Sequence, residues 1–355
     1  MRTMRGRGAP APARAVPAPG DEMLRIDGLD VEFGGGPTRT TALRGVSLAL
    51  DAGRVLGLAG ESGCGKTTAA LAAMGLLPRG AAVRGSVRYR GTELLTLPEK
   101  ELRRYRGRHL AMIFQETTTA LNPVIRVGDQ LMMAARTHLG GGKAGVRERV
   151  LAALADVRLT DVERVMTSYP HELSGGMCQR VNIAMALSCG SRILLADEPT
   201  TALDVSVQEE ILGLLRGLVT RRQLALLMIS HDLAVLADVC DDIAVMYRGE
   251  IVESGPAGSV LARPAHPYTR ALLDCLPLLR GRRDALPELP PAASDAGAER
   301  GCRFRARCGW AIGACLEPPP LAPVRAGRPR MSRCWRSSDV LGSVPAAAGG
   351  NVSCG

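Results

Sequence analysis

The sequence is poor in aromatic residues and in long apolar runs, and each shortage excludes a class of protein. Aromatic side chains make up 3% of the 355 residues, too few for a platform that stacks the bases of single-stranded nucleic acid. No segment reaches the roughly 18 consecutive apolar residues that a membrane-spanning helix needs. The N-terminus is basic but lacks the apolar core of a secretory signal peptide. We therefore expect a cytosolic chain.

Lysine is also scarce, because 42 of the 45 basic residues are arginine. A lysine at an informative position therefore carries extra weight. The formal net charge of +10 is unevenly placed: residues 1–20 carry +4 and residues 276–336 carry +7, whereas residues 21–275 hold 29 basic and 29 acidic residues. A neutral main domain disfavours nucleic acid as a partner, although a basic chain would first suggest one.

Short apolar runs alternate with helical periodicities, which predicts an α/β domain with a largely parallel sheet. Two compact apolar runs, 193–196 and 224–229, flank a helix expected near 206–221. Residues 127–187 have mostly helical periodicity. The apolar runs on either side of Arg248-Gly249 are typical of a hairpin.

One Gly-rich segment fits the pattern G-x-x-x-x-G-K-[ST]. Its residues are Gly60, Glu61, Ser62, Gly63, Cys64, Gly65, Lys66 and Thr67. The segment follows a short apolar strand and opens a helix, which is the context that this motif requires. Glycines let backbone N–H groups turn toward phosphates, and the helix N-terminus adds its positive dipole end. Lys66 supplies a compact charge for the β and γ phosphates and Thr67 a hydroxyl for Mg²⁺, with Thr68 beside them.

Polar side chains follow three other apolar runs. Asp197 and Glu198 end one of them, and Gln115 and His231 follow the other two. A carboxylate at the end of a buried strand can reach phosphate-bound Mg²⁺, which is the role predicted for Asp197. Glu198 can polarise the attacking water as a general base. Gln115 can reach both Mg²⁺ and that water, and His231 can contact the γ phosphate, so we predict that they act with Lys66 and Glu198 in catalysis.

A second anion-binding terminus is expected at Ser174, Gly175 and Gly176, which precede the helix 177–187. A serine and two glycines at a helix start leave backbone N–H groups free for an anion. One nucleotide does not need two such termini from one chain. We therefore expect this terminus to serve a nucleotide held by a partner subunit.

In this order the segments resemble the ATP-binding cassette (ABC) ATPases over residues 23–255, with GESGCGKT similar to the Walker A motif, LSGG to the signature and ILLADE to Walker B. The resemblance implies a P-loop NTPase fold with a RecA-like parallel sheet, an antiparallel β subdomain and an α-helical signature subdomain at about 116–180. It also implies ATP hydrolysis in a head-to-tail dimer. Its motif positions add further ATP contacts: Phe33 as an adenine-stacking aromatic, Gln179, and Asp204 in the D-loop.

Cysteine is the last informative residue type. Ten cysteines in a cytosolic chain argue against a disulfide framework. Four of them lie within 33 residues, at Cys302, Cys308, Cys315 and Cys334. This spacing is wider than the close pairs of structural zinc sites and is compatible with an iron–sulfur cluster, which also takes four cysteines. Zinc, and four free thiols in a loose tail, are the alternatives.

The motif AHPYTR at 265–270, the four-cysteine pattern and Leu121-Asn122-Pro123 resemble the ATPases of dipeptide/oligopeptide importers. In that family the C-terminal region carries a 4Fe–4S cluster, and the subtype with LSGGM pairs with a second ATPase. The resemblance implies an ATPase at the cytoplasmic face of the membrane, with a second ABC ATPase, two permeases and an extracytoplasmic peptide-binding protein as partners. An ATPase of a nickel or metal-chelate importer, or a soluble non-transport ABC ATPase, is the alternative.

Two positions depart from the family pattern. Cys178 stands where a basic residue is common, which affects the contacts of the signature helix, and residues 116–119 lack the usual proline where the cassette meets its membrane subunit.

The sequence predicts four parts of the chain. They are a disordered leader (1–20), an ABC ATPase domain (21–255), a Cys-rich C-terminal region (256–336) and a flexible tail (337–355).

Overall fold

Two β-sheets face each other across a buried apolar cluster that includes the helix 66–73, and the other face of the larger sheet carries a second cluster beneath most of the remaining helices. The computed structural model describes residues 22–35, 39–115, 120–140, 142–201, 203–275, 300–324 and 330–343. The predicted leader (1–20) and the atypical segment 116–119 lie outside the described residues.

The larger sheet has eight strands in the order β11-β12-β10-β9-β3-β8-β7-β6. Its strands are β3 (Val55–Ala59), β6 (Leu110–Ile113), β7 (Ile193–Asp197), β8 (Ala225–Ser230), β9 (Asp242–Tyr247), β10 (Glu250–Pro256), β11 (Ala322–Pro323) and β12 (Met331–Ser332). The strands from β9 to β6 pair in parallel, and β10, β12 and β11 pair antiparallel. Successive side chains of β8 alternate between two cores: Leu226 and Met228 join the cluster under the helices, and Leu227 and Ile229 the cluster under the second sheet.

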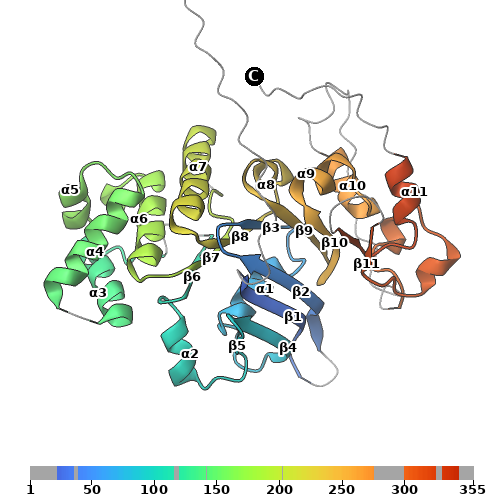
Figure 1. The fold of residues 1–355 in the computed structure, drawn as a ribbon, viewed down its shortest axis with the longest axis horizontal. Coiled ribbons are helices and arrows are strands. Elements are labelled where there is room, and N and C mark those ends of the chain that lie inside the picture. The colour runs from blue at the N-terminus through green and yellow to red at the C-terminus, as the bar shows by residue number, and fades with distance from the viewer. Residues whose placement is uncertain are drawn as a thin grey trace, which may run out of the picture.

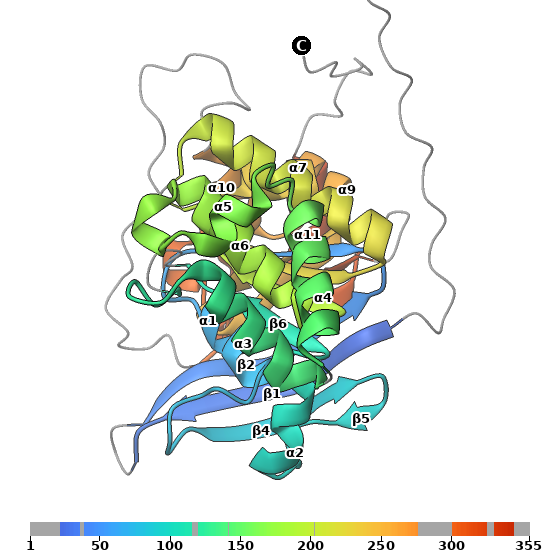
Figure 2. The same cartoon turned by 90° about the vertical axis from the view of Figure 1, so that its left-hand side faces the viewer.

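The second sheet is antiparallel, in the order β2-β1-β4-β5. It consists of β1 (Glu22–Phe33), β2 (Thr40–Asp51), β4 (Ala82–Tyr89) and β5 (Thr92–Glu93), with α2 (Glu99–Tyr105) following it. Helix α1 (Lys66–Ala73) shares a core with this sheet, because its alanines 69 and 70 are buried in the same cluster as Leu24 and Ile26. In Figure 2 the antiparallel sheet and α2 lie in the lower part of the view, and most other helices lie above them.

Four helices form a group at one side of the molecule (Figure 1). They are α3 (Val127–Leu139), α4 (Lys143–Asp156), α5 (Val162–Thr167) and α6 (Gly175–Ser188), and α7 (Val205–Arg222) and α8 (Leu233–Val239) follow them in the chain. No helix among the described residues is long and apolar enough to cross a membrane.

The C-terminal residues continue the larger sheet at its opposite end (Figure 1). Helices α9 (Ala257–Ala262) and α10 (Pro267–Asp274) precede short 3₁₀ helices at Arg305–Arg307 and Gly313–Leu316, and α11 (Ser337–Gly342) ends the described chain. The expected flexible tail therefore begins too early, since 337–342 is helical with Val340 buried. The reason is tertiary: Leu341, beside the buried Val340, packs with Ala265 and Val324. Residues 344–355 lie outside the description.

Candidate functional site

The Gly-rich loop joins β3 to α1, as the sequence predicts. Gly65 caps the N-terminus of α1 with a φ of 110°, a left-handed conformation that favours glycine. Gly60 has a φ of 152°, and a Cβ there would lie 2.3 Å from the Met246 carbonyl oxygen. The glycines are therefore required because the loop passes directly over β9.

Lys66 occupies the centre of this loop. Its side chain is buried, and its Nζ donates hydrogen bonds to the carbonyl oxygens of Gly60 (2.7 Å) and Glu61 (2.9 Å). The adjacent Thr67 hydroxyl hydrogen-bonds with Asp197 at the end of β7. A phosphate that binds in the loop would compete with these carbonyl oxygens for the Lys66 ammonium group.

A cleft of about 460 Å³ opens above the loop. It is lined by Ala42, Ser62, Gly63, Gly65, Lys66, Thr67, Thr68, Gln115, Glu198, Thr201 and His231. The structure therefore brings together the predicted catalytic residues, although they come from four separate segments. Ala42 and Thr201 were not predicted; Thr201 follows Glu198 by three residues, but a threonine in a loop carries no distinctive pattern.

The Glu198 carboxylate is held by three side chains. His231 Nδ1 lies 2.9 Å from its Oε1, and the Gln115 amide (3.1 Å) and the Thr201 hydroxyl (2.9 Å) donate to its Oε2. The Glu198 backbone has a φ of 45°, a sparsely populated conformation for a non-glycine residue, of the kind that clusters at functional sites. Both the backbone and the contacts fix the carboxylate toward the phosphate loop.

The two neighbouring carboxyl groups have opposite electrostatic environments. Burial favours the neutral form of Glu198, but hydrogen bonds from His231 and Thr201 outweigh it and lower the pKa of Glu198. Burial raises the pKa of Asp197, and the nearby Glu198 charge adds to that rise. A cation beside Asp197 would favour its ionised form and so offset the effect of burial, whereas the contacts of Glu198 favour its ionised form without a cation.

The signature residues lie away from the cleft. Ser174 caps α6, its hydroxyl oxygen accepting from the Met177 N–H (3.3 Å), and Asp204 caps α7 in the same way. Helices α6 and α7 begin close together, because a Cβ on Gly176 would lie 2.6 Å from the Val207 side chain. Ser174, Gly175 and Asp204 are exposed, so this terminus faces outward.

Gln179 is placed differently from the prediction. It is fully buried and its amide donates to the Pro199 carbonyl, so it braces the segment after β7 and does not face a nucleotide. Phe33 is half-buried at the end of β1 and does not line the cleft, so its stacking on adenine is still a prediction. Cys178 is a buried residue of α6, with its thiol donating to the Pro170 carbonyl.

The four C-terminal cysteines line one small hollow of about 10 Å³ together with Phe304 and Trp310. Burial, reinforced by the other three thiols, raises the pKa of Cys334 to about 12, and burial also raises the pKa of Cys302 and of Cys308. The Arg336 backbone N–H lies 3.4 Å from the Cys334 sulfur. No group of three or more His, Cys, Asp or Glu side chains in the described part of the chain is arranged to hold a metal ion.

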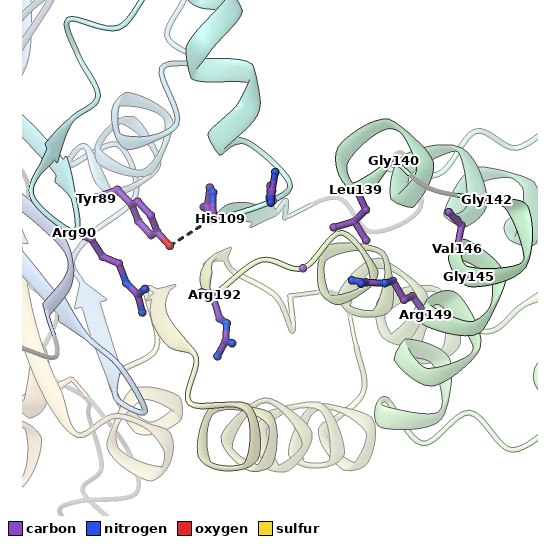
Figure 3. A pocket seen from close by; sticks show the side chains of 12 residues that line it. Tyr89, Arg90, His109, Leu139, Gly140, Gly142, Gly145, Val146, Arg149 and Arg192 are labelled. Atoms are coloured by element: carbon purple, nitrogen blue, oxygen red, sulfur yellow. Dashed lines mark hydrogen bonds between the residues drawn. The ribbon is translucent and has the colours of Figure 1, made fainter.

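A separate cleft of about 580 Å³ lies at the far end of the parallel strands. Figure 3 shows Arg90, Arg149 and Arg192 around it, with the Tyr89 hydroxyl 3.2 Å from His109. Burial lowers the pKa of His109, and the charges of nearby arginines lower it further. No residue of the phosphate loop lines this cleft, so cavity size does not identify the nucleotide site.

Two family models match the chain. The model described as "ABC transporter" matches residues 43–201, and the one described as "Oligopeptide/dipeptide transporter, C-terminal region" matches residues 252–315. The first match covers the phosphate loop, Glu198 and the signature. The second includes three of the four clustered cysteines.

Curated relatives match along nearly their whole length. A "Probable peptide ABC transporter ATP-binding protein" of Sinorhizobium fredii is 44% identical over 90% of this chain and 97% of the relative. The "Oligopeptide transport ATP-binding protein OppD" of Salmonella typhimurium is 42% identical over 93% and 98%, and the "Dipeptide transport ATP-binding protein DppD" of Escherichia coli is 41% identical over 90% and 98%.

Solved structures match the ATPase part of the fold. The ATP-binding cassette MJ0796, a dimer bound to ADP and phosphate, is 27% identical with a TM-score of 0.58, over 66% of this chain and 99% of that one. The protein cbiO1 of Clostridium perfringens, part of an ABC transporter complex, is 25% identical with a TM-score of 0.59, over 68% and 91%. The α/β P-loop fold inferred from the sequence is thereby confirmed.

Proposed function

The chain belongs to the ABC transporter family, and from this membership and the cleft geometry we propose that it hydrolyses ATP to power the import of dipeptides or oligopeptides. The Glu198 carboxylate, held by His231, Gln115 and Thr201 opposite the phosphate loop, is the observation that carries the chemistry. The names of the relatives favour peptides over nickel or metal chelates as cargo.

The roles of the cleft residues follow from their positions. The loop N–H groups and Lys66 bind the phosphates, with Thr68 beside them at the start of α1. The Thr67 hydroxyl, Gln115 and Asp197 would hold Mg²⁺, which when bound neutralises phosphate charge. Glu198 accepts a proton from the attacking water, and the hydrogen bonds that lower its pKa keep it in the ionised form that can do so. His231 fixes the orientation of that carboxylate.

The outward-facing signature terminus supports the proposal of a head-to-tail dimer. Ser174, Gly175 and Gly176 do not line the chain's own cleft, and Val205 beside Asp204 is 75% exposed. In the dimer these residues contact ATP bound by the other ATPase. The LSGGM sequence favours a second, different ATPase subunit as that partner, with two permeases at the cytoplasmic face of the membrane and an extracytoplasmic peptide-binding protein completing the importer.

The proposed domains are an ABC ATPase domain at 21–255, with its helical subdomain at about 116–180, and a C-terminal region from 256. We place the end of this region beyond 336, because α11 packs onto it.

The four clustered cysteines form a proposed metal site, with a 4Fe–4S cluster as the favoured occupant. Four thiols that share one hollow supply the donor set that such a cluster takes. The hollow has room for about one water molecule, so a cluster requires the surrounding loops to open slightly, whereas zinc requires less space. Anaerobically purified protein should contain about four iron atoms per chain. Stoichiometric zinc without iron would instead identify the zinc site.

The scarcity of lysine allows a matched test of the ATPase. Lys66→Ala should reduce ATP hydrolysis and ATP-driven peptide uptake by the reconstituted importer at least about 100-fold, because the phosphates lose their buried cation. Lys100→Ala removes an exposed lysine on α2 and should leave both rates unchanged. Equal rates for the two variants would contradict the assignment of the cleft.

A further inference from the structure

One arginine of the C-terminal region contacts the phosphate-binding loop. Arg307, directly before Cys308, donates from Nη1 to Glu61 Oε2 (3.0 Å) and from Nη2 to Glu61 Oε1 (2.9 Å). The Arg307 side chain is 7% exposed and that of Glu61 34%. Paired hydrogen bonds of this kind fix geometry as well as charge. This contact joins residues 246 positions apart in the chain.

A second contact to Glu61 comes from α10. The Glu61 backbone N–H donates to the Tyr268 hydroxyl oxygen (3.0 Å), and Tyr268 is fully buried. The Glu61 carbonyl accepts from Lys66 Nζ. Glu61 is therefore held on one side by Arg307 and Tyr268 and on the other by the lysine that binds phosphate.

An aromatic cluster fixes both of these groups. The Phe304 ring lies 5.3 Å from that of Tyr247 and 5.4 Å from that of Tyr268 (centroid distances). Arg307 Nη1 also donates to the Tyr247 hydroxyl (3.3 Å). Phe304 is 3% exposed. Packing of the segment 302–308 against β9 and α10 therefore determines where the Arg307 guanidinium lies.

We propose that Arg307 and Tyr268 are positioning residues of the phosphate loop, through which the packing of the C-terminal region against the ATPase core sets the affinity for ATP. The inference rests on the proposed function of the cleft. When Lys66 leaves the carbonyls of Gly60 and Glu61 to bind phosphate, the loop loses its internal contacts. Arg307 and Tyr268 then keep its N–H groups in place, and Arg307 also neutralises the Glu61 carboxylate beside an anion site.

The test measures the Kd of MgATP for the purified full-length chain, and KM and kcat in the assembled transporter. Arg307→Ala should raise Kd and KM about 5- to 20-fold with little change in kcat, because Glu198 and His231 are untouched. Tyr268→Phe should act in the same direction but less. Arg307→Lys should lie between the wild type and Arg307→Ala, since lysine keeps the charge but not the fork.

Arg303→Ala is the matched control. Arg303 belongs to the same segment and pairs with Glu250 on β10 (2.9 Å), without contacting the loop. The inference is overturned if Arg307→Ala and Arg303→Ala have the same Kd as the wild type. It is also overturned if Arg307→Ala leaves Kd and KM unchanged and lowers the apparent kcat only because less of the protein is folded. Failure of the wild type to bind MgATP would instead contradict the proposed function.

The double variant Glu61→Gln/Arg307→Ala separates the two contributions. If Arg307 acted only by neutralising Glu61, removing both charges would restore the wild-type Kd and contradict a positioning role. Positioning predicts that the double variant still binds MgATP more weakly than the wild type, because the loop has lost its paired hydrogen bonds.

Discussion

The ATPase core and the described C-terminal residues are held together by different forces. The core has a continuous buried cluster of aliphatic side chains from the larger sheet and its helices. Residues 300–343 contribute few buried apolar side chains, among them Phe304, Cys315, Val324, Val340 and Leu341. Apart from Phe304, which joins the core cluster, ion pairs hold them to the core: Arg303 with Glu250, Arg307 with Glu61 and Arg330 with Glu253. The core is therefore stabilised mainly by apolar burial, whereas residues 300–343 also depend on carboxylate acceptors that the core supplies.

The ion pairs of the C-terminal region also differ from one another. The pair Arg330–Glu253 is buried, and the same carboxylate accepts the backbone N–H groups of Ala265 and His266 (2.9 Å each). The pair Arg307–Glu61 is partly exposed and lies on the phosphate loop. The first has a structural role, and the second connects structure to nucleotide binding.

The largest effect is expected from the chemistry of the core. Glu198→Gln should reduce ATP hydrolysis about 100- to 10,000-fold, because an amide cannot accept the proton of the attacking water. ATP binding, measured separately, should persist because Lys66 and the loop are unchanged. If Glu198→Gln hydrolysed ATP at the wild-type rate, Glu198 would not be the general base and the assignment of the cleft would be wrong.

The next largest effect is expected from the buried ion pair Arg330–Glu253, which joins the C-terminal region to β10. Arg330→Ala should lower the free energy of unfolding by about 3–5 kcal/mol, since Glu253 keeps a buried charge without its cation. Thermal or denaturant unfolding of the full chain would measure this change. Glu253→Gln/Arg330→Met should be much less destabilising, because both charges are removed together. If the double variant were worse than the single one, the two residues would not act as a pair.

The third prediction tests whether a metal bound by the four cysteines also stabilises the C-terminal region. Cys315→Ser should lower the metal content of purified protein well below that of the wild type and reduce its melting temperature, since a bound metal stabilises the folded state by mass action. Cys189→Ser changes a buried cysteine outside the cluster and should leave the metal content unchanged. Equal metal content in the two variants would contradict the proposed site.

The smallest effect is expected from an exposed ion pair of the core. Arg147 and Glu163 join α4 and α5 at the surface, with side-chain exposures of 42% and 69%. Arg147→Ala should change the free energy of unfolding by about 0.5 kcal/mol or less, because solvent screens such pairs. If Arg147→Ala lowered the free energy of unfolding as much as Arg330→Ala, the exposed and the buried ion pair would contribute equally, which contradicts the comparison.

Local patterns predicted most of the cleft. The loop around Lys66 and the polar residues after β6, β7 and β8 are each set by a few neighbouring residues, so a single sequence reveals them. Gln179 was misplaced because a motif position does not show whether a side chain is buried. Thr201 was missed because its role depends on where the Glu198 carboxylate turns.

The sequence by itself determined the order of strand, glycine loop and helix and the chemistry of the groups at the strand ends, because these depend on residues close together in the chain. Tertiary structure alone decided which of the 42 arginines faces Glu61. An arginine has the same chemistry everywhere, and its partner is chosen by packing. Here that choice is made by Phe304, whose ring lies against Tyr247 and Tyr268 and places Arg307 over the phosphate loop.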